Sequence, residues 1–370
     1  MVHETNSSRD RSRRAFIGAV GAAGLGLAAS TSIAASSDGD PTPIDSPTVI
    51  EEPGEYELVA DLAPDRLEQP GCILVDLRDE QGRSSVHGDF TLYGNGHTVD
   101  LSGTELDFED PWRRATGIAF DPRERWGGAL ESSWDATVED IEIRGANTGI
   151  SSWRASFGTY TDVTVAENDT GFYFYIDGSD LIDCVIEENQ TGVNLYGDTE
   201  VWGGSQSTFE NCTIRSNDRA GIVTGPESNA RIRSSRIIGN GDGVVSFTEG
   251  PGTVIEESHI CYNDGYGVYG LAWPGSEEYP EDDRPIQASV QATNNYWGSD
   301  NGPLSLERRR NEQDSGYEYV QPDEPFTDRE TGRSADGDGD AISESLESGV
   351  SNVRFDPFSE APFDDVGAQR

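Results

Sequence analysis

The chain of 370 residues contains no lysine, one methionine, four histidines and four cysteines. Its 26 basic residues, all arginine, stand against 69 acidic residues, and the formal net charge is −43. So large a negative charge excludes the basic footprint that nucleic-acid binding requires, and it disfavours docking on anionic lipid. An acidic surface without lysine is typical of proteins that work in concentrated salt, where self-repulsion is screened over very short distances. The composition therefore indicates a halophilic source.

Metal ligands of the soft and imidazole type are equally scarce. No C-x-x-C motif and no His/Cys spacing typical of zinc occurs in the chain. Copper binding needs thioether, thiolate or imidazole ligands, yet Met1 and His3 lie in a segment that is expected to be removed. We therefore expect neither a zinc nor a copper site.

Long hydrophobic runs are missing beyond the N-terminus, so no membrane span is expected. Residues 1–35 are predicted to be a twin-arginine signal peptide, because Ser12-Arg13-Arg14-Ala15-Phe16-Ile17 precedes a Gly/Ala-rich run and a small-x-small cleavage site near Ala34. We expect cleavage after Ala34 or Ala35 and a secreted or cell-surface protein. Residues 36–47 are acidic and contain proline, which predicts a disordered linker.

Helical periodicity is also absent, and a repeat with another period takes its place between Ala136 and Gly298. Copies such as DVTVAENDTGF, DCVIEENQTGV and SSRIIGNGDGV share an apolar residue, an asparagine and a glycine. The first five intervals between asparagines are 21, 21, 28, 23 and 23 residues. The column consists of Asn147, Asn168, Asn189, Asn217, Asn240, Asn263 and finally Asn294 or Asn295. Such a period predicts a stacked solenoid.

The residue types within each unit predict short strands separated by tight turns. Val, Ile, Thr, Tyr and Phe alternate with Asn, Asp, Gly and Ser. Asparagine tolerates the left-handed backbone region at a corner and can bond its neighbour along the axis. The glycine of each unit also forms a column along the repeat. The residue after each column glycine is apolar and is placed inside the coil: Ile118, Ile150, Phe172, Val193, Ile222, Val244 and Val268. Cys184 and Cys212 should stack on adjacent coils, as buried thiols rather than a disulfide, because their side chains point in parallel.

The pattern resembles the right-handed parallel β-helix family, in its NosD-like and pectate-lyase-like branch, over roughly Thr48 to Phe358. TVIEEPGEYELVADL resembles the N-terminal cap, FTLYGNGHTVDL the first coil, and NNYWGSDNGP and VRFDPF the closing segments. The resemblance implies an all-β, single-stranded right-handed parallel β-helix. The β-helix, including its N-terminal cap, is expected to span residues 48–306. Residues 307–370 are expected to form an irregular acidic C-terminal extension with the closing segment. The family implies no single activity, because this scaffold hosts lyases, hydrolases, adhesins and inert modules.

An aromatic stripe is the candidate ligand face. Counting four residues from each column glycine gives outward aromatic side chains on four coils, and counting six gives a carboxylate on four coils. The eight candidates are Trp153, Tyr175, Tyr196, Phe247, Asp177, Asp198, Glu227 and Glu249. Sugar faces stack on aromatic rings, while carboxylates bond hydroxyls or hold Ca²⁺. The competing interpretation is that aromatic residues simply favour strands and that acidic residues fill every corner of so acidic a chain.

Catalysis is the alternative to binding at this face. A lyase would need a base such as Arg154, with Asp177 and Asp198 holding Ca²⁺, and a hydrolase would need two carboxylates such as Asp177 and Asp198. No lyase signature motif is present. The leading hypothesis is therefore binding of extracellular or cell-surface carbohydrate without catalysis. A polysaccharide lyase or glycoside hydrolase and a purely structural surface module remain the alternatives.

One further stretch has calcium-loop spacing. Positions 1, 3, 5, 9 and 12 of an EF-hand-type loop are matched by Asp336, Asp338, Asp340, Glu344 and Glu347. Position six is Ala341, where glycine is wanted. The same stretch also resembles the closing turn that precedes VRFDPF. We favour the closing turn and keep Ca²⁺ as the only cofactor hypothesis.

Overall fold

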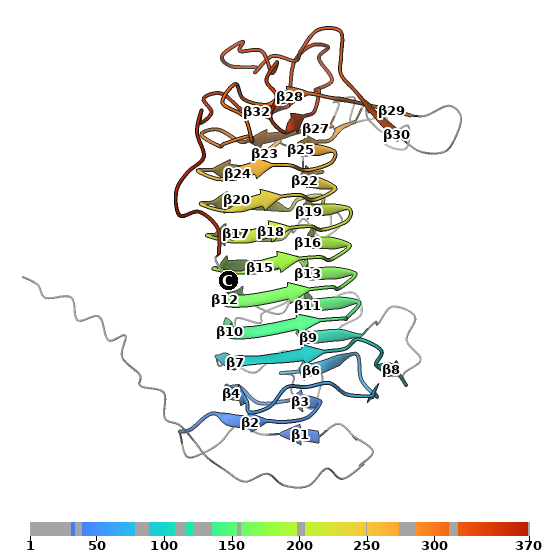
Figure 1. The fold of residues 1–370 in the computed structure, drawn as a ribbon. Helices are drawn as coiled ribbons and strands as arrows, with labels where there is room; N and C mark the ends of the chain where they lie inside the picture. Colours follow the sequence, from blue (N-terminus) through green and yellow to red (C-terminus); the bar gives the residue numbers. More distant parts are fainter. Residues whose placement is uncertain are drawn as a thin grey trace, which may run out of the picture.

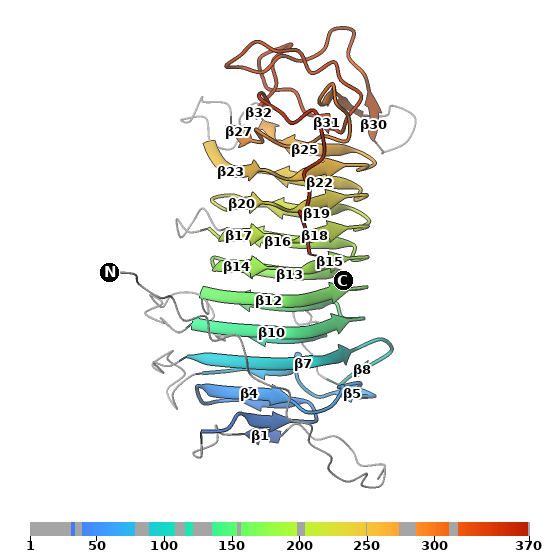
Figure 2. The ribbon, with the colours of Figure 1, turned by 60° about the vertical axis from the view of Figure 1, so that its left-hand side comes forward.

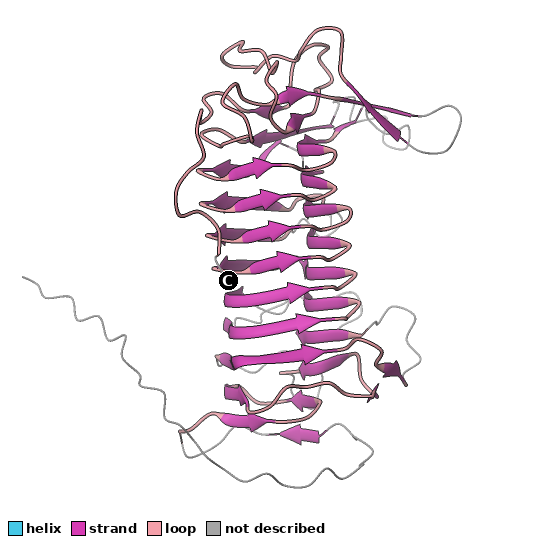
Figure 3. Cartoon of the chain, viewed as in Figure 1, coloured by secondary structure: helices cyan, strands magenta, loops and turns pink. Residues whose placement is uncertain are grey.

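The structure is a computed structural model, and it describes residues 31–33, 39–77, 89–107, 115–120, 135–153, 157–197, 204–248, 250–273, 286–310 and 317–368. These residues form strands and turns (Figure 3). The described part of the chain contains no helix that is long and apolar enough to cross a membrane. The twin-arginine motif lies outside the described residues, so export by that pathway stays a prediction.

The described strands stack into an elongated solenoid (Figures 1 and 2), in which each coil pairs in parallel with the next. The first sheet has twelve strands. Its order is β1 (Thr31–Ile33), β3 (Thr48–Ile50), β6 (Gly71–Val75), β9 (Thr116–Phe120), β11 (Thr148–Trp153), β13 (Thr170–Tyr175), β16 (Thr191–Tyr196), β19 (Ala220–Thr224), β22 (Asp242–Ser246), β25 (Tyr266–Gly270), β31 (Ala341–Ile342) and β28 (Leu304–Ser305).

The second sheet has sixteen strands, and part of it is divided by a corner. Its main path is β2 (Thr42–Ile44), β4 (Gly54–Leu58), β7 (Phe90–Asp100), β10 (Asp135–Arg144), β12 (Phe157–Ala166), β14 (Gly178–Ile182), β17 (Gln206–Glu210), β20 (Asn229–Arg233), β23 (Gly250–Glu256), β27 (Ile286–Gln291) and β26 (Ala272–Trp273). Beside it run β15 (Val185–Glu187), β18 (Thr213–Arg215), β21 (Arg236–Ile238), β24 (His259–Cys261) and β32 (Val353–Arg354).

A corner divides the later coils of the second sheet. β10 and β12 are each continuous, whereas β14 and β15 are separate strands, as are their successors. The residue at the division has a left-handed backbone in each coil: Asp183, Asn211, Ser234 and Glu257. The coils therefore present three faces, which are the first sheet and the two parts of the second. The prediction of an all-β parallel β-helix is confirmed.

Strand register confirms the predicted interior positions. Ile150, Phe172, Val193, Ile222, Val244 and Val268 follow one another in the first sheet, and each is fully buried. The glycine before each is required by a close approach between coils. A Cβ on Gly171, for example, would lie 2.5 Å from the carbonyl oxygen of Gly192. Stacking of equivalent positions therefore sets both the core and the glycine column.

The predicted asparagine stack is confirmed in its central five members, which we call the Asn ladder: Asn168, Asn189, Asn217, Asn240 and Asn263. In each step the amide nitrogen of one asparagine donates to the Oδ1 of the next, as in the 3.0 Å bond from Asn189 to Asn217. The left-handed backbone falls on the residue before the asparagine, as at Glu167 and Glu188, and not on the asparagine itself.

Both ends of the predicted column are wrong. Ala146, not Asn147, occupies the first position, and its N–H donates to Asn168 Oδ1. Asn295 closes a different corner, where it accepts a bond from the N–H of Ser258. The last position of the Asn ladder belongs to Asp340, whose Oδ2 accepts the Asn263 amide at 2.5 Å and the Asn263 backbone N–H at 3.1 Å.

Asp340 is expected to make stability depend on pH. Burial raises the pKa of this carboxyl from 3.8 to about 6, although the Asn263 donors favour its charged form. A folded-state pKa above the unfolded value means that the protonated form is favoured in the fold, so the free energy of unfolding should fall as pH rises from about 4 to 6. The expected loss is about 2 kcal/mol.

Asp340→Asn should remove this loss, because asparagine continues the ladder without a charge. We expect the variant to be more stable than the wild type at pH 7 and to lack the slope between about pH 4 and 6. Urea unfolding across that range measures the difference, with Asp338→Asn, an exposed neighbour, as the control. Identical pH profiles for Asp340→Asn and the wild type would contradict the assignment.

The predicted segment boundaries need two corrections. Part of residues 36–47 is a strand and not a disordered linker, because Thr42–Ile44 pairs with Tyr56–Leu58 and Ile44 is 1% exposed. The solenoid also continues past residue 306, since β31 and β32 extend the two sheets. The rest of the C-terminal extension includes an antiparallel hairpin of β29 (Glu307–Arg310) and β30 (Tyr317–Val320). Near the other end, β5 (Arg66–Leu67) pairs with β8 (Glu105–Leu106).

Candidate functional site: an aromatic ladder

Three outward aromatic side chains at the ends of β11, β13 and β16 stack on one another. Trp153 pairs in register with Tyr175, and Tyr175 with Tyr196. The ring centroids of Trp153 and Tyr175 lie 4.9 Å apart at 28°, and those of Tyr175 and Tyr196 lie 5.6 Å apart at 16°. We call these three residues the aromatic ladder. Trp153 is 47% and Tyr196 43% exposed, so these two side chains face outward.

The rings of the aromatic ladder cover one another. Because consecutive rings are nearly parallel and stack at about the strand spacing, they occupy one another's inner faces. Tyr173 lies beside Trp153, with centroids 5.9 Å apart. Burial, with Tyr196 and Tyr175 nearby, raises the pKa of Tyr173 to about 12. Its hydroxyl therefore stays protonated and can act as a hydrogen-bond donor throughout the physiological range.

A missing side chain interrupts the aromatic ladder at Gly225. Thr224 pairs with Leu195 and with Ser246, so the next residue, Gly225, follows Tyr196 and precedes Phe247. A Cβ on Gly225 would lie 3.4 Å from Tyr196 Cδ2 and 3.2 Å from the Leu195 carbonyl oxygen. We call this break in the row of rings, at Gly225 between Tyr196 and Phe247, the Gly225 notch; the Gly225 backbone itself is buried. Its ends are two coils apart, or roughly 9.6 Å.

The two described members of the predicted row of carboxylates, Asp177 and Glu227, do not form a row beside the stripe. Asp177 is 6% exposed and belongs to an inner corner, where its N–H donates to Ser205 Oγ at 3.2 Å. Glu227 is exposed, but Ser228 and not Glu227 is equivalent to Asp177, because Gly178 pairs with Gln206 and Gln206 with Asn229. Asp198, Glu249 and Arg154 lie outside the described residues. Counting from the glycine fails because the corners differ in length from coil to coil.

The five acidic residues with calcium-loop spacing do not converge. Asp338 accepts a bond from the Asn301 amide, Glu344 accepts the Gly349 N–H, and Glu347 pairs with Arg329 at 3.2 Å. Asp340 ends the Asn ladder, and the Asp336 backbone bridges to Leu304. Within the residues that the structure describes, no three His, Cys, Asp or Glu side chains form a group that could hold a metal. The arrangement is that of the closing turn, with Ala341 and Ile342 forming β31.

The four cysteines are buried thiols, as expected. Cys184 Sγ donates to the Tyr160 carbonyl and Cys212 Sγ to the Leu181 carbonyl, both at 3.3 Å. Burial, reinforced by Cys184, raises the pKa of the Cys212 thiol well above its ordinary value. The Cys212 thiol is therefore protonated, and the four buried thiols are structural and add nothing to the chemistry of the aromatic ladder.

Comparisons with known proteins agree with this fold. Residues 128–275 match the family model described as "Right handed beta helix region". Among solved structures, the chain is similar to the A-module of the Azotobacter vinelandii mannuronan C-5 epimerase AlgE4, with 12% identity, a TM-score of 0.40, and coverage of 75% of this chain and 80% of that one. Comparison with proteins of curated function returned no match.

The chain is also similar to two further solved structures. A double mutant of the periplasmic alginate epimerase AlgG has 14% identity and a TM-score of 0.43, covering 85% of this chain and 76% of that one. Pectate lyase Pel9A has 12% identity and a TM-score of 0.32, covering 68% and 62%. At these identities and scores the likeness concerns the fold alone. The chain is a right-handed parallel β-helix protein.

Proposed function

We propose that this protein binds a carbohydrate polymer at the aromatic ladder and the Gly225 notch, without catalysing a reaction on it. The observation that carries the proposal is the order of outward side chains on successive coils: three stacked rings, one glycine, then Phe247. The setting that we propose is the cell surface or the medium, reached through the segment at residues 1–35.

The spacing of the Gly225 notch suits a sugar ring. Stacked rings have centroids at least 4.5 Å apart, so a ring that is sandwiched between two aromatic planes needs about 9 Å. The interval between Tyr196 and Phe247 is roughly 9.6 Å, and Tyr196, which stacks on Tyr175 on one side, borders it. Trp153, which is 47% exposed, ends the aromatic ladder on the other side. A polymer that follows the axis would meet both.

Binding without catalysis is favoured by the carboxylates near the aromatic ladder. Of the described members of the predicted acidic row, Asp177 is buried and only Glu227 is exposed. A hydrolase would need two carboxylates that reach the same bond from opposite sides. Glu227 alone can bond a hydroxyl but cannot supply both the acid and the base or nucleophile.

A binding screen combined with a product assay tests the proposal. Affinity electrophoresis of the full chain in gels that contain a neutral glucan, alginate, pectate or chitosan should show retardation by at least one polymer. Trp153→Ala should weaken that retardation about fivefold, because one stacking face is lost. Tyr262→Ala is the matched control, since Tyr262 is 76% exposed and lies at another corner.

The product assay separates the alternatives. Incubation with the retarding polymer should release no soluble sugar and no unsaturated uronate. Release of either product would make the protein an enzyme and overturn the non-catalytic part of the proposal. Absence of retardation by every polymer would favour a structural surface module.

A further inference from the structure

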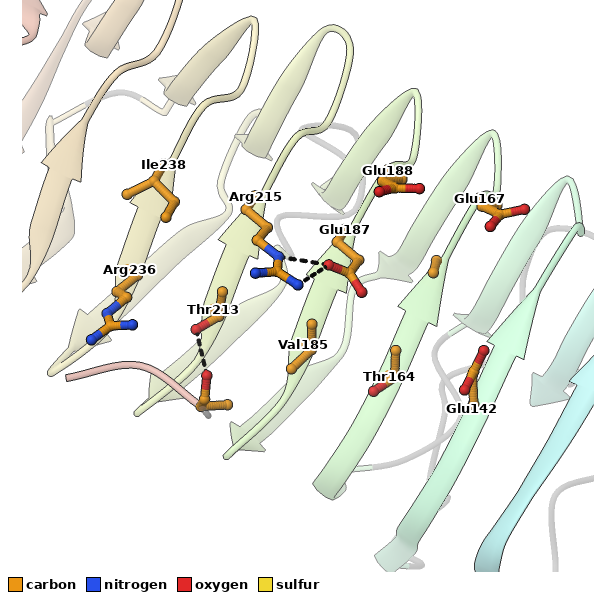
Figure 4. A pocket seen from close by; sticks show the side chains of 12 residues that line it. Glu142, Thr164, Glu167, Val185, Glu187, Glu188, Thr213, Arg215, Arg236 and Ile238 are labelled. Carbon is orange, nitrogen blue, oxygen red and sulfur yellow. Dashed lines mark hydrogen bonds and ion pairs between the residues drawn. The ribbon is translucent and has the colours of Figure 1, made fainter. Parts of the chain in front are cut away.

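A groove of about 540 Å³ lies on the outer face of β12, β15, β18 and β21, which belong to a different sheet from the aromatic ladder (Figure 4). Its floor follows one column of the register, from Thr164 through Val185 to Thr213 and Arg236. Glu142, Glu167, Glu187 and Glu188 line its sides together with Arg215. Neither the proposed function nor the predicted sites account for this face.

The C-terminal tail, residues 359–368, already lies on one end of this column. Figure 1 shows the tail running back along the coils from the closing segments to the level of β15. The Phe363 N–H donates to His259 Nε2 at 2.8 Å, and the two rings stack with centroids 6.0 Å apart. Further along, the Gly367 N–H donates to the Ser234 carbonyl at 2.9 Å. The tail thus lies along the axis of the solenoid, and it is not fully extended, because Asp365 and Gly367 have positive φ.

The contact at Thr213 shows how the floor holds a peptide. Thr213 Oγ1 donates to the Ala368 carbonyl at 2.9 Å. Gly367 approaches so closely that a Cβ there would lie 2.7 Å from Thr213 Oγ1 and 2.8 Å from Arg236 Cγ. Ala368 itself lines the groove. The tail therefore contacts the column at Thr213 and Arg236, and Val185 and Thr164 continue the column on the next two coils.

Thr164 occupies the equivalent position two coils further on. It is 5% exposed, and among the described residues its Oγ1 has no hydrogen-bond partner. A buried hydroxyl without a partner carries a desolvation cost that a ligand carbonyl would remove. Two coils span roughly 9.6 Å, a distance that four residues of an incompletely extended chain can cover. An even step is needed because successive carbonyls alternate in direction along a strand-like chain. A peptide that continued the course of the tail would therefore bring a carbonyl to Thr164.

We propose that this open column, from Val185 to Thr164, binds an extended basic peptide segment of a partner protein. The negative charge at the edge of the groove favours a basic segment. Glu167 and Glu188 are exposed, and within the described residues neither has an ion-pair partner, whereas Glu187 is held by Arg215 at 2.6 Å. Arginine or lysine side chains of the bound segment pair with Glu167 and Glu188 while its backbone follows the column.

Fluorescence anisotropy with synthetic peptides tests this inference. The probes are a labelled, end-blocked heptapeptide of alternating valine and arginine and its counterpart with glutamate in place of arginine. The full chain, in the lowest salt at which it stays folded, should bind the arginine peptide at least tenfold more tightly than the glutamate peptide. Molar salt should reduce that preference, because exposed ion pairs are screened.

Variants then locate the site. Thr164→Val keeps the shape of the side chain and removes the hydroxyl, and it should weaken binding of the arginine peptide about five- to tenfold. The double variant Glu167→Gln, Glu188→Gln should remove most of the preference for arginine. Thr208→Val, on the outer side of β17, is the matched control and should bind like the wild type.

Three results would overturn the proposal. They are equal binding of both peptides by the wild type, equal weakening by Thr164→Val and Thr208→Val, and displacement of the arginine peptide by the polysaccharide that binds the aromatic ladder. The last result would mean that the groove is a glycan site. Loss of peptide binding with retained polysaccharide binding separates this inference from the proposed function.

Discussion

Replacing Asn189 by leucine is expected to lower the free energy of unfolding by about 4 kcal/mol. The amide of Asn189 donates to the Val165 carbonyl and to Asn217 Oδ1, and its Oδ1 accepts both the N–H and the amide of Asn168. Leucine has a similar volume, so no large cavity forms. The loss comes from buried donors and acceptors that are left without partners, each costing about 1–3 kcal/mol.

Asn194→Leu is the matched control for this prediction. Asn194 lies on the same coil, in β16, and its side chain faces outward between its register neighbours Tyr173 and Val223. A substitution at such a position should change stability by less than about 0.5 kcal/mol. Guanidinium unfolding followed by circular dichroism measures both variants. Similar losses in both would mean that the Asn ladder does not hold the coils together.

Filling the Gly225 notch is expected to abolish polysaccharide binding. Gly225→Tyr continues the aromatic ladder from Tyr196 toward Phe247 and occupies the space that we assign to a sugar ring. The affinity should fall more than tenfold, a loss of at least about 1.4 kcal/mol. The measurement is isothermal titration with the polymer that retards the wild type.

Gly225→Ala separates the effect of the ring from that of the backbone. Its Cβ meets the Leu195 carbonyl oxygen at the same 3.2 Å, so both variants carry the same local strain. Alanine leaves most of the notch open and should bind within about twofold of the wild type. If alanine weakens binding as much as tyrosine does, the space over Gly225 is not the sugar site.

The sequence predicted positions well within strands and poorly at corners. Alternation between inside and outside determines which side chain a strand buries, so Phe172 and Val193, and the outward Trp153 and Tyr196, were predictable. No such rule limits the number of residues in a corner. Counting from the glycine therefore assigned Asp177 to the wrong column, because the segments that follow the first-sheet strands differ in length.

Contacts between distant parts of the chain could not be predicted from a repeat. Asp340 lies 77 residues after Asn263 and still takes the next place in the Asn ladder. Nothing in its spacing distinguishes it from a calcium ligand, and only the neighbouring closing segment hinted at its role. The tail gave a weaker signal, in which Phe363 and Val366 are the two large apolar residues of the stretch. The orientation of the rings could not be predicted either, because the sequence places the rings in register but does not indicate how they stack.

The ratio of polysaccharide affinities between Tyr196→Ala and Tyr262→Ala tests the central claim most directly. Both substitutions remove an exposed tyrosine ring, but only Tyr196 borders the Gly225 notch. Isothermal titration should give about tenfold weaker binding for Tyr196→Ala and wild-type affinity for Tyr262→Ala. Equal affinities for the two variants would contradict the claim that carbohydrate binds at the aromatic ladder.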